Sequence, residues 1–494
     1  MIVAQETVRV RIAPSPTGHW HLGGVRTALF NWLFARQHRG VFVVRIEDTD
    51  KARSKQEFEI EIFETLQWLQ LDWDEGSVDS ISNLEPRTSN YKGEYGPYRQ
   101  SERAHLYRGY LERLLNEGKA YYCYCTKEDL DAERQSLLAA GLAPKYSGRC
   151  RELRKPPAGE KSNIIRFRIP EVTVEFKDLI RGSVSFDASL FGDVIIARDL
   201  DSSLFSFAVT VDDELMRISH VIRGEEHISN TPKQMLLQRA LGFREPVYGH
   251  LPLILAADRS KLSKRYAETS ILRYRQDGYL PEAMLNFLSL LGWHPKDDRE
   301  IFTLDDLIQE FDLRRVQKAG AAFSAEKLDW INAQHMKKLT SAEIRQRLGP
   351  FFEEKKMNAP EEFLKKVIEA ERERMKNLKD FFVLTDFFFE LPEYEAGLLI
   401  WKDEPVSNIK TILENSLAVI KTIPSDEFER LTIVPALDGL VNEHGRGAVY
   451  WPLRVAVSGK SASPDPFVIM EILGREETVH RLEVAIEKIE TLIA

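Results

Sequence analysis

The sequence predicts an α/β catalytic part with a doubly wound parallel sheet and an inserted α+β subdomain, followed by all-α C-terminal domains. Three observations lead to this prediction. Strand-like and helix-like segments alternate between residues 8 and 71, as they do at the start of a doubly wound sheet. The pattern changes between residues 106 and 205 and then returns to α/β. Beyond residue 281, apolar spacing and composition favour helices.

The first strand and helix meet at a corner rich in glycine and histidine. Valine and isoleucine alternate with arginine through Val8–Ile12, which predicts a half-buried strand. Helical spacing begins after Gly24, and His21 and Gly23 lie in the corner. A helix start offers unpaired N–H groups and a partial positive charge, so the corner favours phosphate. It contains neither GxGxxG nor GxxxxGK[ST], so a different nucleotide-binding mode is expected. A turn that only packs is the alternative on these residues alone.

A second strand is expected at Val41–Ile46, which is apolar enough to be buried on both faces and hence parallel to the first. It runs directly into the acidic segment Glu47–Asp50. Open α/β sheets bind ligands at the carboxyl ends of their strands, so this segment is a candidate ligand site. A helix from Ser54 to Leu71 follows and continues the doubly wound pattern.

The segment between residues 106 and 205 is predicted to be an insertion into a single nucleotide-binding fold. It combines one helix and two strand-like runs, at Tyr107–Asn116, Ile164–Ile169 and Asp193–Ala197. The α/β pattern then resumes, at Phe205–Val211, Ile218–Ile222 and a helix over Thr231–Leu241. The parent fold is therefore expected to be discontinuous in sequence.

All three cysteines, Cys123, Cys125 and Cys150, lie within this insertion. Clustered thiols in a reducing compartment more often bind zinc than form a disulfide. A tetrahedral site needs a fourth ligand, and Tyr146 and Glu152 are both near enough in sequence. The cysteines therefore predict a zinc site whose fourth ligand stays open between these two residues.

The second half of the chain begins with an apolar run and a basic loop. The run is Val247–Leu255, and the loop, residues 258–265, carries Lys261, Lys264 and two arginines. A solvated surface loop is the alternative for this charge cluster. Helices are then expected at Glu282–Leu291, Glu361–Phe382, Val406–Lys421 and Glu476–Leu492.

Composition limits the function classes. A chain of 494 residues exceeds the size of one core, so several domains are expected. The start lacks a signal-peptide pattern, and no stretch reaches about 18 uncharged apolar residues, which predicts a cytoplasmic protein without a membrane partner. The net charge of -9 argues against tight nonspecific nucleic-acid binding but allows a local basic face for one shaped RNA.

Three motifs together resemble glutamyl-tRNA synthetase, a class I aminoacyl-tRNA synthetase of the bacterial type. They are PSPTGHWHLGG near the start, VRIEDTD at the end of the second strand, and KLSKR downstream. His21–Gly24 matches the HIGH signature of that family, and Lys261–Arg265 matches KMSKS. The likeness extends through VDDELMRISHVIRGEEHISNTPKQ, LLGWHP and WPLRVAVSGK and so covers essentially the full length.

The resemblance implies ATP-dependent ligation of L-glutamate to tRNA through glutamyl-adenylate, with transfer to the terminal ribose 2′-hydroxyl. It implies ATP and Mg²⁺ as cofactors, zinc at the cysteines, tRNA-Glu as the partner, and a monomer. The implied catalytic residues are His21, Lys261 and Lys264. The implied ATP-binding residues are Thr17, His21, Gly23, Gly24, Lys264 and Arg265. The implied glutamate-binding residues are Arg11, Ala13, Ser15, Glu47, Phe205 and Arg223, and the metal ligands are Cys123, Cys125, Cys150 and Tyr146.

The needs of the substrate support two of these assignments. Glutamate has an ammonium group and a side-chain carboxylate to be recognised, while its α-carboxylate must stay free to react. Arg11 suits the side-chain carboxylate and Glu47 suits the ammonium group. An ordinary structural ion pair is the alternative for these two residues.

The resemblance also implies a domain plan. Residues 1–105 and 206–258 form the Rossmann-like catalytic domain, and residues 106–205 form the inserted subdomain that binds the tRNA acceptor end. Residues 259–340, which carry the KLSKR loop, contact the stem. Residues 341–494 form a helical anticodon-binding region of two modules.

The sequence departs from the family pattern at three places. Phe205 replaces a usual tyrosine, so one hydrogen bond worth about 1 kcal/mol is expected to be lost from glutamate binding. Glu268 follows the lysine loop, where an acid would repel phosphates if it faced them. Glu152 stands where a histidine metal ligand often follows.

These departures leave two alternatives open. One is a second, specialised glutamyl-tRNA synthetase that charges tRNA-Gln with glutamate. The other is a non-catalytic tRNA-binding paralogue, which is less favoured because His21 and Lys264 are both present. A glutaminyl-tRNA synthetase is disfavoured because its anticodon-binding part is a β-barrel, whereas this C-terminal half is predicted to be helical.

Overall fold

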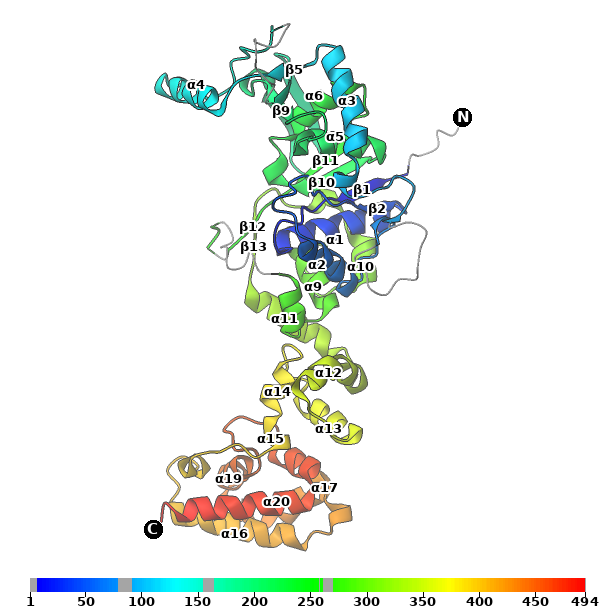
Figure 1. Ribbon diagram of the computed structural model, residues 1–494. Helices are drawn as coiled ribbons and strands as arrows, with labels where there is room; N and C mark the ends of the chain where they lie inside the picture. Colours follow the sequence, from blue (N-terminus) through cyan, green and yellow to red (C-terminus); the bar gives the residue numbers. More distant parts are fainter. Residues whose placement is uncertain (1–6, 79–90, 154–163, 257, 261–269, 494) are drawn as a thin grey trace. The chain divides into compact units, whose positions relative to one another are not determined.

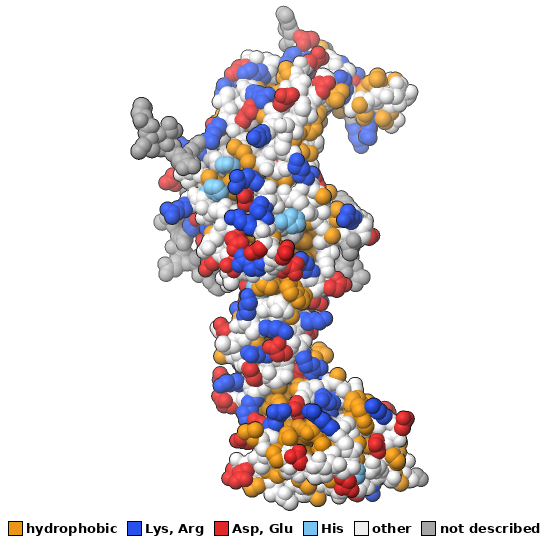
Figure 2. Space-filling model, turned by 180° about the vertical axis from the view of Figure 1, so that it is seen from behind, with side chains coloured by type: hydrophobic (Ala, Val, Ile, Leu, Met, Phe, Trp, Pro, Cys, Tyr) orange, Lys and Arg blue, Asp and Glu red, His pale blue; other side chains and the backbone are white. Residues whose placement is uncertain are grey.

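The computed structural model describes residues 7–78, 91–153, 164–256, 258–260 and 270–493. The chain forms two compact units (Figure 1). Unit 1 comprises Met1–Gln276 and Pro281–Leu328, and unit 2 comprises Asp277–Leu280 and Asp329–Ala494. Among the described helices, none is both long enough and apolar enough to cross a membrane. Basic and acidic side chains are interspersed on the face of each unit that Figure 2 shows.

The first sheet of unit 1 confirms the predicted parallel opening. Its strand order is β1 (Arg9–Ile12), β2 (Val41–Val44), β3 (Glu75–Ser77) and β4 (Tyr91–Lys92). The first three strands are parallel, with Arg9 opposite Val41 and Val43 opposite Glu75, and β4 is antiparallel. The connecting helices are α1 (Leu22–Gln37) and α2 (Gln56–Trp68).

A second pair of parallel strands forms its own two-stranded sheet next to β1. It consists of β10 (His220–Gly224) and β11 (Val247–Leu251), with α5 (Phe205–Leu215) and α6 (Thr231–Leu241) as neighbouring helices. The Ser219 amide donates to the Arg9 carbonyl at 2.9 Å, and the Arg9 amide donates to the Ser219 hydroxyl at 2.8 Å. The two segments of the fold, separated by the insertion, thus meet side by side.

The inserted segment combines two antiparallel sheets with two helices. The helices are α3 (Ala104–Asn116) and α4 (Lys127–Ala139); the sheets are β5 (Ala120–Cys123), β6 (Ile164–Phe167) and β9 (Val194–Ala197), and the hairpin β7 (Thr173–Asp178) with β8 (Gly182–Asp187). Helix α4 has no buried side chain and projects from the rest of unit 1 (Figure 1). Val43, Tyr107 and Phe207 belong to one core cluster, so the insertion and the parent sheet share a core.

The apolar run Val247–Leu255 divides between two sheets. Its first part is β11, whereas Ile254–Leu255 forms β12 and pairs in parallel with β13 (Ala321–Ala322). Unit 1 is completed by short helices, which are α8 (Leu272–Gln276), α9 (Pro281–Leu290), α10 (Leu304–Glu310) and the 3₁₀ turn η4 (Leu313–Arg315). The basic segment Lys261–Arg265 lies outside the described residues.

Unit 2 is helical in its described part, as predicted. Its helices are α12 (Ser341–Lys355), α13 (Glu361–Glu371), α14 (Asp380–Leu384), α15 (Asp386–Phe389), α16 (Val406–Thr422), α17 (Arg430–Ala436), α18 (Asp438–His444), α19 (Arg446–Ser458) and α20 (Pro466–Glu490). Helix α11 (Ala325–Lys337) begins in unit 1 and ends in unit 2. The buried Arg481 of α20 donates to the carbonyls of Phe387 at 2.6 Å and Val457 at 2.7 Å and so ties α15 and α19 to α20.

One predicted helix is divided in the structure, and another is confirmed at its start. The expected helix Glu361–Phe382 is two helices, because the Asp380 carboxylate accepts from the amide of Lys376 at 2.7 Å and starts α14 anew. The helix expected from Glu476 agrees with the structure, because α20 (Pro466–Glu490) consists of two helices and the second begins just after Gly474. Gly474 separates the two helices with φ 80° and ψ 168°, a conformation open to glycine.

Candidate active site

A cavity of about 630 Å³ lies in unit 1 at the carboxyl ends of β1 and β10. It collects every described residue that the sequence assigned to ATP or glutamate: Arg11, Ala13, Ser15, Thr17, His21, Gly23, Gly24, Glu47, Phe205 and Arg223. Lys261, Lys264 and Arg265, and with them Glu268, lie outside the described residues. Ile254 of β12 also lines the cavity, so the strand that leads toward the lysine segment starts at its wall.

The strand-to-helix corner supplies one wall of this cavity. Helix α1 begins at Leu22, three residues earlier than predicted, because His21 is its N-cap and the His21 side chain accepts from the Gly24 amide at 3.4 Å. Burial lowers the pKa of His21, and Glu226 opposes the shift. A Cβ on Gly24 would lie 2.4 Å from Nε1 of Trp20, so close packing of the indole requires glycine here.

The two residues proposed for glutamate are held by separate partners. Nε of Arg11 lies 3.2 Å from Oδ1 of Asp213, and Nη2 of Arg45 lies 3.1 Å from Oε1 of Glu47. Nη1 of Arg45 also lies 2.7 Å from Oδ1 of Asp213. Arg11 and Glu47 are therefore linked through Arg45 and Asp213, and both still line the cavity.

Burial and the neighbouring arginines together set the pKa values of the two carboxylates in this network. It raises the pKa of Glu47 to about 6, against the opposing effects of Arg45 and Arg11. Burial also acts to raise the pKa of Asp213, but Arg11 and Arg45 more than offset it, and the pKa falls below its usual value. Asp213 is thus the permanent anion of the pair, and Glu47 titrates nearer to neutrality.

Arg223 projects from the end of β10 at another wall of the cavity. Its Nη2 donates to Oγ1 of Thr231 and to Oε1 of Gln234, both at 2.8 Å. Burial lowers the pKa of Arg223 to about 10, so the side chain remains cationic near pH 7. Phe205 packs beside His227, with ring centroids 5.6 Å apart.

Sequence reasoning missed several residues of this site. Asp213 and Arg45 form its central ion pair, and Arg26, Glu226 and His227 line the cavity. The signal for Asp213 and Arg45 was present, because VDDEL and VRIEDTD both place charges inside apolar segments. Arg26 likewise interrupts the apolar surface of α1, and its guanidinium donates to the carbonyls of Leu291 at 3.1 Å and of Pro252.

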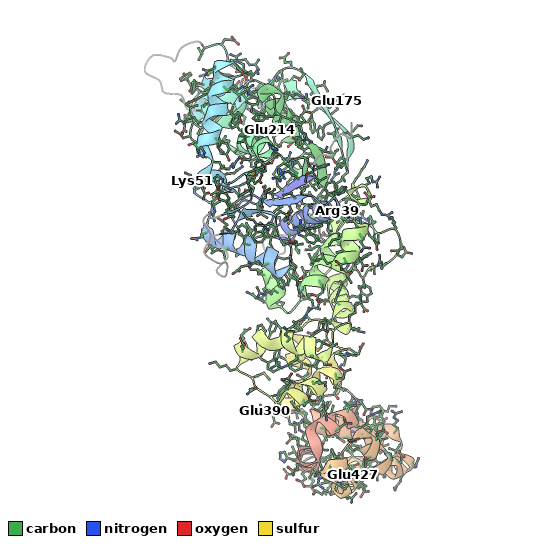
Figure 3. All side chains as sticks on the ribbon, turned by 90° about the vertical axis from the view of Figure 1, so that its right-hand side faces the viewer. Arg39, Lys51, Glu175, Glu214, Glu390 and Glu427 are labelled. Atoms are coloured by element: carbon green, nitrogen blue, oxygen red, sulfur yellow. The ribbon has the colours of Figure 1, made fainter. Side chains whose placement is uncertain are left out.

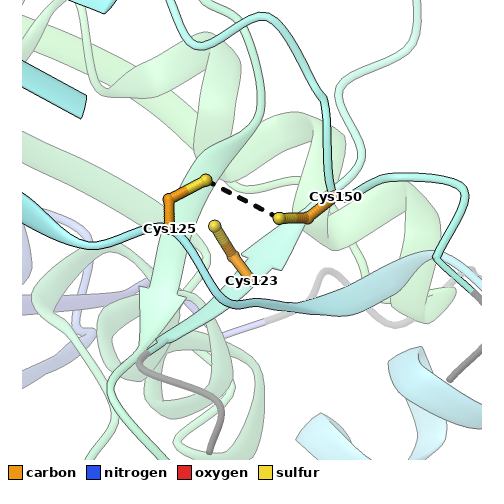
Figure 4. A group of neighbouring side chains, drawn as sticks. All are labelled: Cys123, Cys125 and Cys150. Carbon is orange, nitrogen blue, oxygen red and sulfur yellow. Dashed lines mark hydrogen bonds between the residues drawn. The ribbon is translucent and has the colours of Figure 1, made fainter. Parts of the chain in front are cut away.

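The three cysteines meet at the end of β5 (Figure 4). Their sulfur atoms all lie within 4.8 Å of one another, and Cys125 and Cys150 are 3.6 Å apart. The Tyr146 hydroxyl is 3.6 Å from the sulfur atoms of both Cys123 and Cys125. Glu152 instead pairs with Arg168 at 2.9 Å, and its side chain is 84% exposed. The geometry thus favours Tyr146 over Glu152 as the fourth donor.

Comparison with known proteins gives two family matches. The family described as tRNA synthetases class I (E and Q), catalytic domain, matches residues 7–330. The family described as anticodon binding domain matches residues 343–486. The first match covers nearly all of unit 1, and the second lies within unit 2.

Relatives and solved structures match over nearly the whole chain. The glutamate–tRNA ligase of Carboxydothermus hydrogenoformans is 44% identical, covering 96% of this chain and 99% of the relative. Glutamate–tRNA ligase 1 of Caldicellulosiruptor saccharolyticus is 42% identical, covering 96% and 98%. The crystal structure of a glutamate tRNA ligase from Elizabethkingia meningosepticum in complex with its amino acid has a TM-score of 0.85 and 34% identity, covering 98% of this chain and 100% of that one.

Proposed function

The chain belongs to the class I tRNA synthetases for glutamate and glutamine, among the glutamate–tRNA ligases, and on this premise we propose which residues carry the reaction. The protein is an aminoacyl-tRNA synthetase that ligates glutamate to tRNA with ATP. One observation carries the residue assignment: the HIGH-like corner, Arg11, Glu47 and Arg223 all line a single cavity at the carboxyl ends of the sheet.

The chemistry needs positioned charge rather than a protein nucleophile. The glutamate α-carboxylate attacks the α-phosphate of Mg-ATP, forming glutamyl-adenylate and releasing pyrophosphate. The terminal ribose 2′-hydroxyl of tRNA then attacks the activated carbonyl, and AMP leaves. The protein contributes by holding the reactants in line and by placing donors where phosphate charge develops.

The glutamate subsite is proposed to lie between Arg11, Glu47 and Arg223. Arg11 would pair with the side-chain carboxylate while Asp213 holds its guanidinium, and Glu47 would hold the ammonium group. Ala13, Ser15 and Phe205 complete this wall of the cavity. Phe205 offers a ring face without a hydroxyl, which supports the prediction that one glutamate hydrogen bond is lost.

The ATP subsite is proposed to lie over the start of α1. Thr17, His21, Gly23 and Gly24 line the cavity there, and the N-cap position of His21 places its ring at the positive end of the helix. Lys264, with Lys261 and Arg265 beside it, is proposed to contact the pyrophosphate side of ATP. This last assignment rests on the KLSKR motif and on its position just after β12.

The cysteine cluster fits zinc in donor type and spacing. Three thiols and a phenol hydroxyl surround one point, and thiolates are preferred zinc ligands. We propose that Cys123, Cys125, Cys150 and Tyr146 hold a structural Zn²⁺. The ion would join the end of β5 to the loop around Cys150 at the base of the exposed α4.

The RNA partner is proposed to be tRNA-Glu, bound by a monomer in the cytoplasm. The relatives named above are all glutamate–tRNA ligases, and their names do not favour the specialised enzyme for tRNA-Gln. The domain plan stands as part of the proposal, with residues 106–205 at the acceptor end, residues 259–340 at the stem and residues 341–494 at the anticodon. The match of residues 343–486 to an anticodon binding domain supports the last of these.

Aminoacylation of purified tRNA tests the proposal. The protein is expected to attach labelled glutamate to tRNA-Glu in an ATP-dependent reaction, and Lys264→Ala is expected to lower kcat by about 100-fold or more, because a donor to the reacting phosphates is lost. Preferential charging of tRNA-Gln would revive the specialised enzyme, whereas equal efficiency on tRNA-Glu and tRNA-Gln would exclude it. The absence of glutamate-dependent pyrophosphate exchange with intact tRNA would contradict the assignment.

A further inference from the structure

The turn of the β7–β8 hairpin reaches from the inserted segment to the wall of the catalytic cavity. The Leu179 amide donates to the Tyr248 carbonyl of β11 at 2.9 Å, and the Arg181 guanidinium pairs with Glu225. Glu225 in turn accepts from the Leu253 amide at 2.9 Å. Leu253 lines the cavity, so the turn is docked directly behind this wall. Glu175, which lies on β7 three residues before Asp178, is at the outer edge of unit 1 (Figure 3).

A buried carboxylate and a buried histidine form the centre of this contact. Oδ2 of Asp178 lies 2.6 Å from Nδ1 of His250, and both side chains have no exposed surface. Oδ1 of Asp178 accepts from the amides of Ile180 at 2.9 Å and Arg181 at 2.8 Å. With its other oxygen occupied by amide donors, Asp178 acts as an acceptor, and Nδ1 of His250 must carry the proton between them.

The second nitrogen of His250 faces Arg223. Nε of Arg223 donates to Nε2 of His250 at 3.3 Å, and Oγ1 of Thr231 lies 2.9 Å from the same nitrogen. A guanidinium can only donate, so Nε2 of His250 must be the acceptor. Asp178 selects the tautomer with the proton on Nδ1, which leaves a lone pair on Nε2. The Arg223 guanidinium is thereby held at Nε by His250, while Thr231 and Gln234 hold Nη2.

We propose that Asp178 and His250 are positioning residues that orient Arg223 for the substrate glutamate, which makes the inserted hairpin part of the amino acid site. This inference rests on the proposed assignment of Arg223 to glutamate. Neither Asp178 nor His250 lines the cavity, so they act through Arg223. A guanidinium fixed before binding loses less freedom when it meets a carboxylate, so the effect is expected in the affinity for glutamate.

Two substitutions at His250 separate its two contacts. In His250→Asn the amide nitrogen can still donate to Asp178, but no atom replaces the acceptor Nε2. In His250→Gln the side-chain oxygen can reach the position of Nε2 and accept from Arg223. Asp178→Asn removes the charge that selects the tautomer. The matched control is Asp187→Asn. Asp187 lies at the open end of the same hairpin, and its carboxylate accepts from the Ser189 amide at 2.9 Å.

The measurement is glutamate-dependent ATP–pyrophosphate exchange in the presence of tRNA-Glu, with KM for glutamate, KM for ATP and kcat obtained separately. His250→Asn and Asp178→Asn are expected to raise KM for glutamate about 10-fold, the effect of one lost hydrogen bond to a charged group, with little change in the other two parameters. His250→Gln is expected to recover most of the wild-type KM. Asp187→Asn is expected to behave as wild type.

Three outcomes overturn the inference. One is an unchanged KM for glutamate in His250→Asn when thermal melting shows a folded protein. Another is a parallel change in KM for ATP and kcat, since that indicates general disturbance of the fold. The third is equal behaviour of the two His250 variants. If the wild-type protein itself shows no exchange, the proposed function fails first; if Arg223→Lys leaves KM for glutamate unchanged, the assignment of Arg223 fails.

Discussion

At the scale of single residues, the site is organised by charges that the fold buries. Arg45 has no exposed side-chain surface and touches the carboxylates of Asp213 and Glu47. Burying such groups is costly, and only close pairing offsets the cost. Asp213 also contacts Arg11, so one carboxylate serves two arginines. Removing it leaves two buried cations without their common anion.

Asp213→Asn is therefore expected to lower the free energy of unfolding by about 3–5 kcal/mol, the usual effect of breaking a buried ion pair. It should also raise KM for glutamate, because Arg11 loses its anchor. Urea denaturation and steady-state kinetics measure the two effects. Asp201→Asn, which removes an ion pair with Arg108 at the surface, is the control and should change little. Equal stability of the two variants would contradict this account of the network.

The pH dependence of glutamate binding should report on Glu47. Its pKa is raised to about 6 by burial, so the carboxylate loses its charge as the pH falls through 6 and can no longer attract the substrate ammonium group. KM for glutamate is expected to rise roughly 10-fold between pH 7 and pH 5. Glu47→Gln should have a higher KM without this dependence. A variant that keeps the wild-type profile would show that another group titrates.

Protonation of Glu47 is not expected to unfold the protein over this interval. The pKa of Glu47 is higher in the folded state than its ordinary value of 4.5. The folded state therefore takes up the proton first, and this group adds stability as the pH falls from above 6 toward 4.5. Thermal melting at pH 5 and pH 7 separates a change in binding from a loss of folded enzyme.

At the scale of elements, the cysteine cluster joins a strand to a projecting helix. Helix α4 has no buried side chain, so few apolar contacts hold it. Its start follows directly from Cys125, and Thr126 caps it by accepting from the Asp129 amide at 3.1 Å. A metal at Cys125 would therefore hold the base of this helix.

Zinc content can be measured independently of activity. The wild-type protein is expected to carry about one zinc per chain, and Cys150→Ser should lose most of it and melt at a lower temperature, because the ion stabilises the folded segment. Glu152→Gln is the control and should keep its zinc, since Glu152 pairs with Arg168. Tyr146→Phe tests the fourth donor, because a lower zinc content in this variant is expected if the Tyr146 hydroxyl binds the ion. Zinc retained in Cys150→Ser but lost in Glu152→Gln would contradict the proposed ligand set.

At the scale of the whole molecule, charge of both signs is interspersed over the faces in Figure 2. With a net charge of -9, tRNA binding must depend on local basic side chains. Arg314 is 84% exposed, with Asp312 at 2.9 Å, whereas Arg315 donates to the carbonyls of His294 and Pro295. Of these two neighbours in η4, only Arg314 presents its guanidinium mainly to solvent.

Arg314→Glu is expected to raise KM for tRNA several-fold at low salt and less at high salt, because a phosphate contact would be replaced by repulsion. KM for ATP and for glutamate should not change. Arg315→Glu is expected to lower stability as well, since two carbonyls lose their donor. An unchanged KM for tRNA in Arg314→Glu at every salt concentration would show that Arg314 does not contact the tRNA.

The sequence by itself determined the elements that depend on local pattern. Alternating apolar residues predicted β1, a continuous apolar run predicted β2 and its parallel pairing with β1, and helical spacing predicted the all-α second half. The signatures around His21 and Glu47 predicted candidate site residues that line one cavity, because such motifs place their groups at strand ends whatever lies elsewhere. Helix ends were less predictable, as the break after Glu371 shows.

Only the tertiary structure decided which charges meet. Asp213 and Arg11 are 202 positions apart in the chain, Asp213 and Arg45 are 168 apart, and Asp178 and His250 are 72 apart. No local pattern encodes such pairs, since their contact depends on how the insertion and the two parts of the sheet pack together. Local periodicity and motifs thus indicated the candidate site, whereas the buried partners that set the charge and orientation of its residues follow from long-range packing.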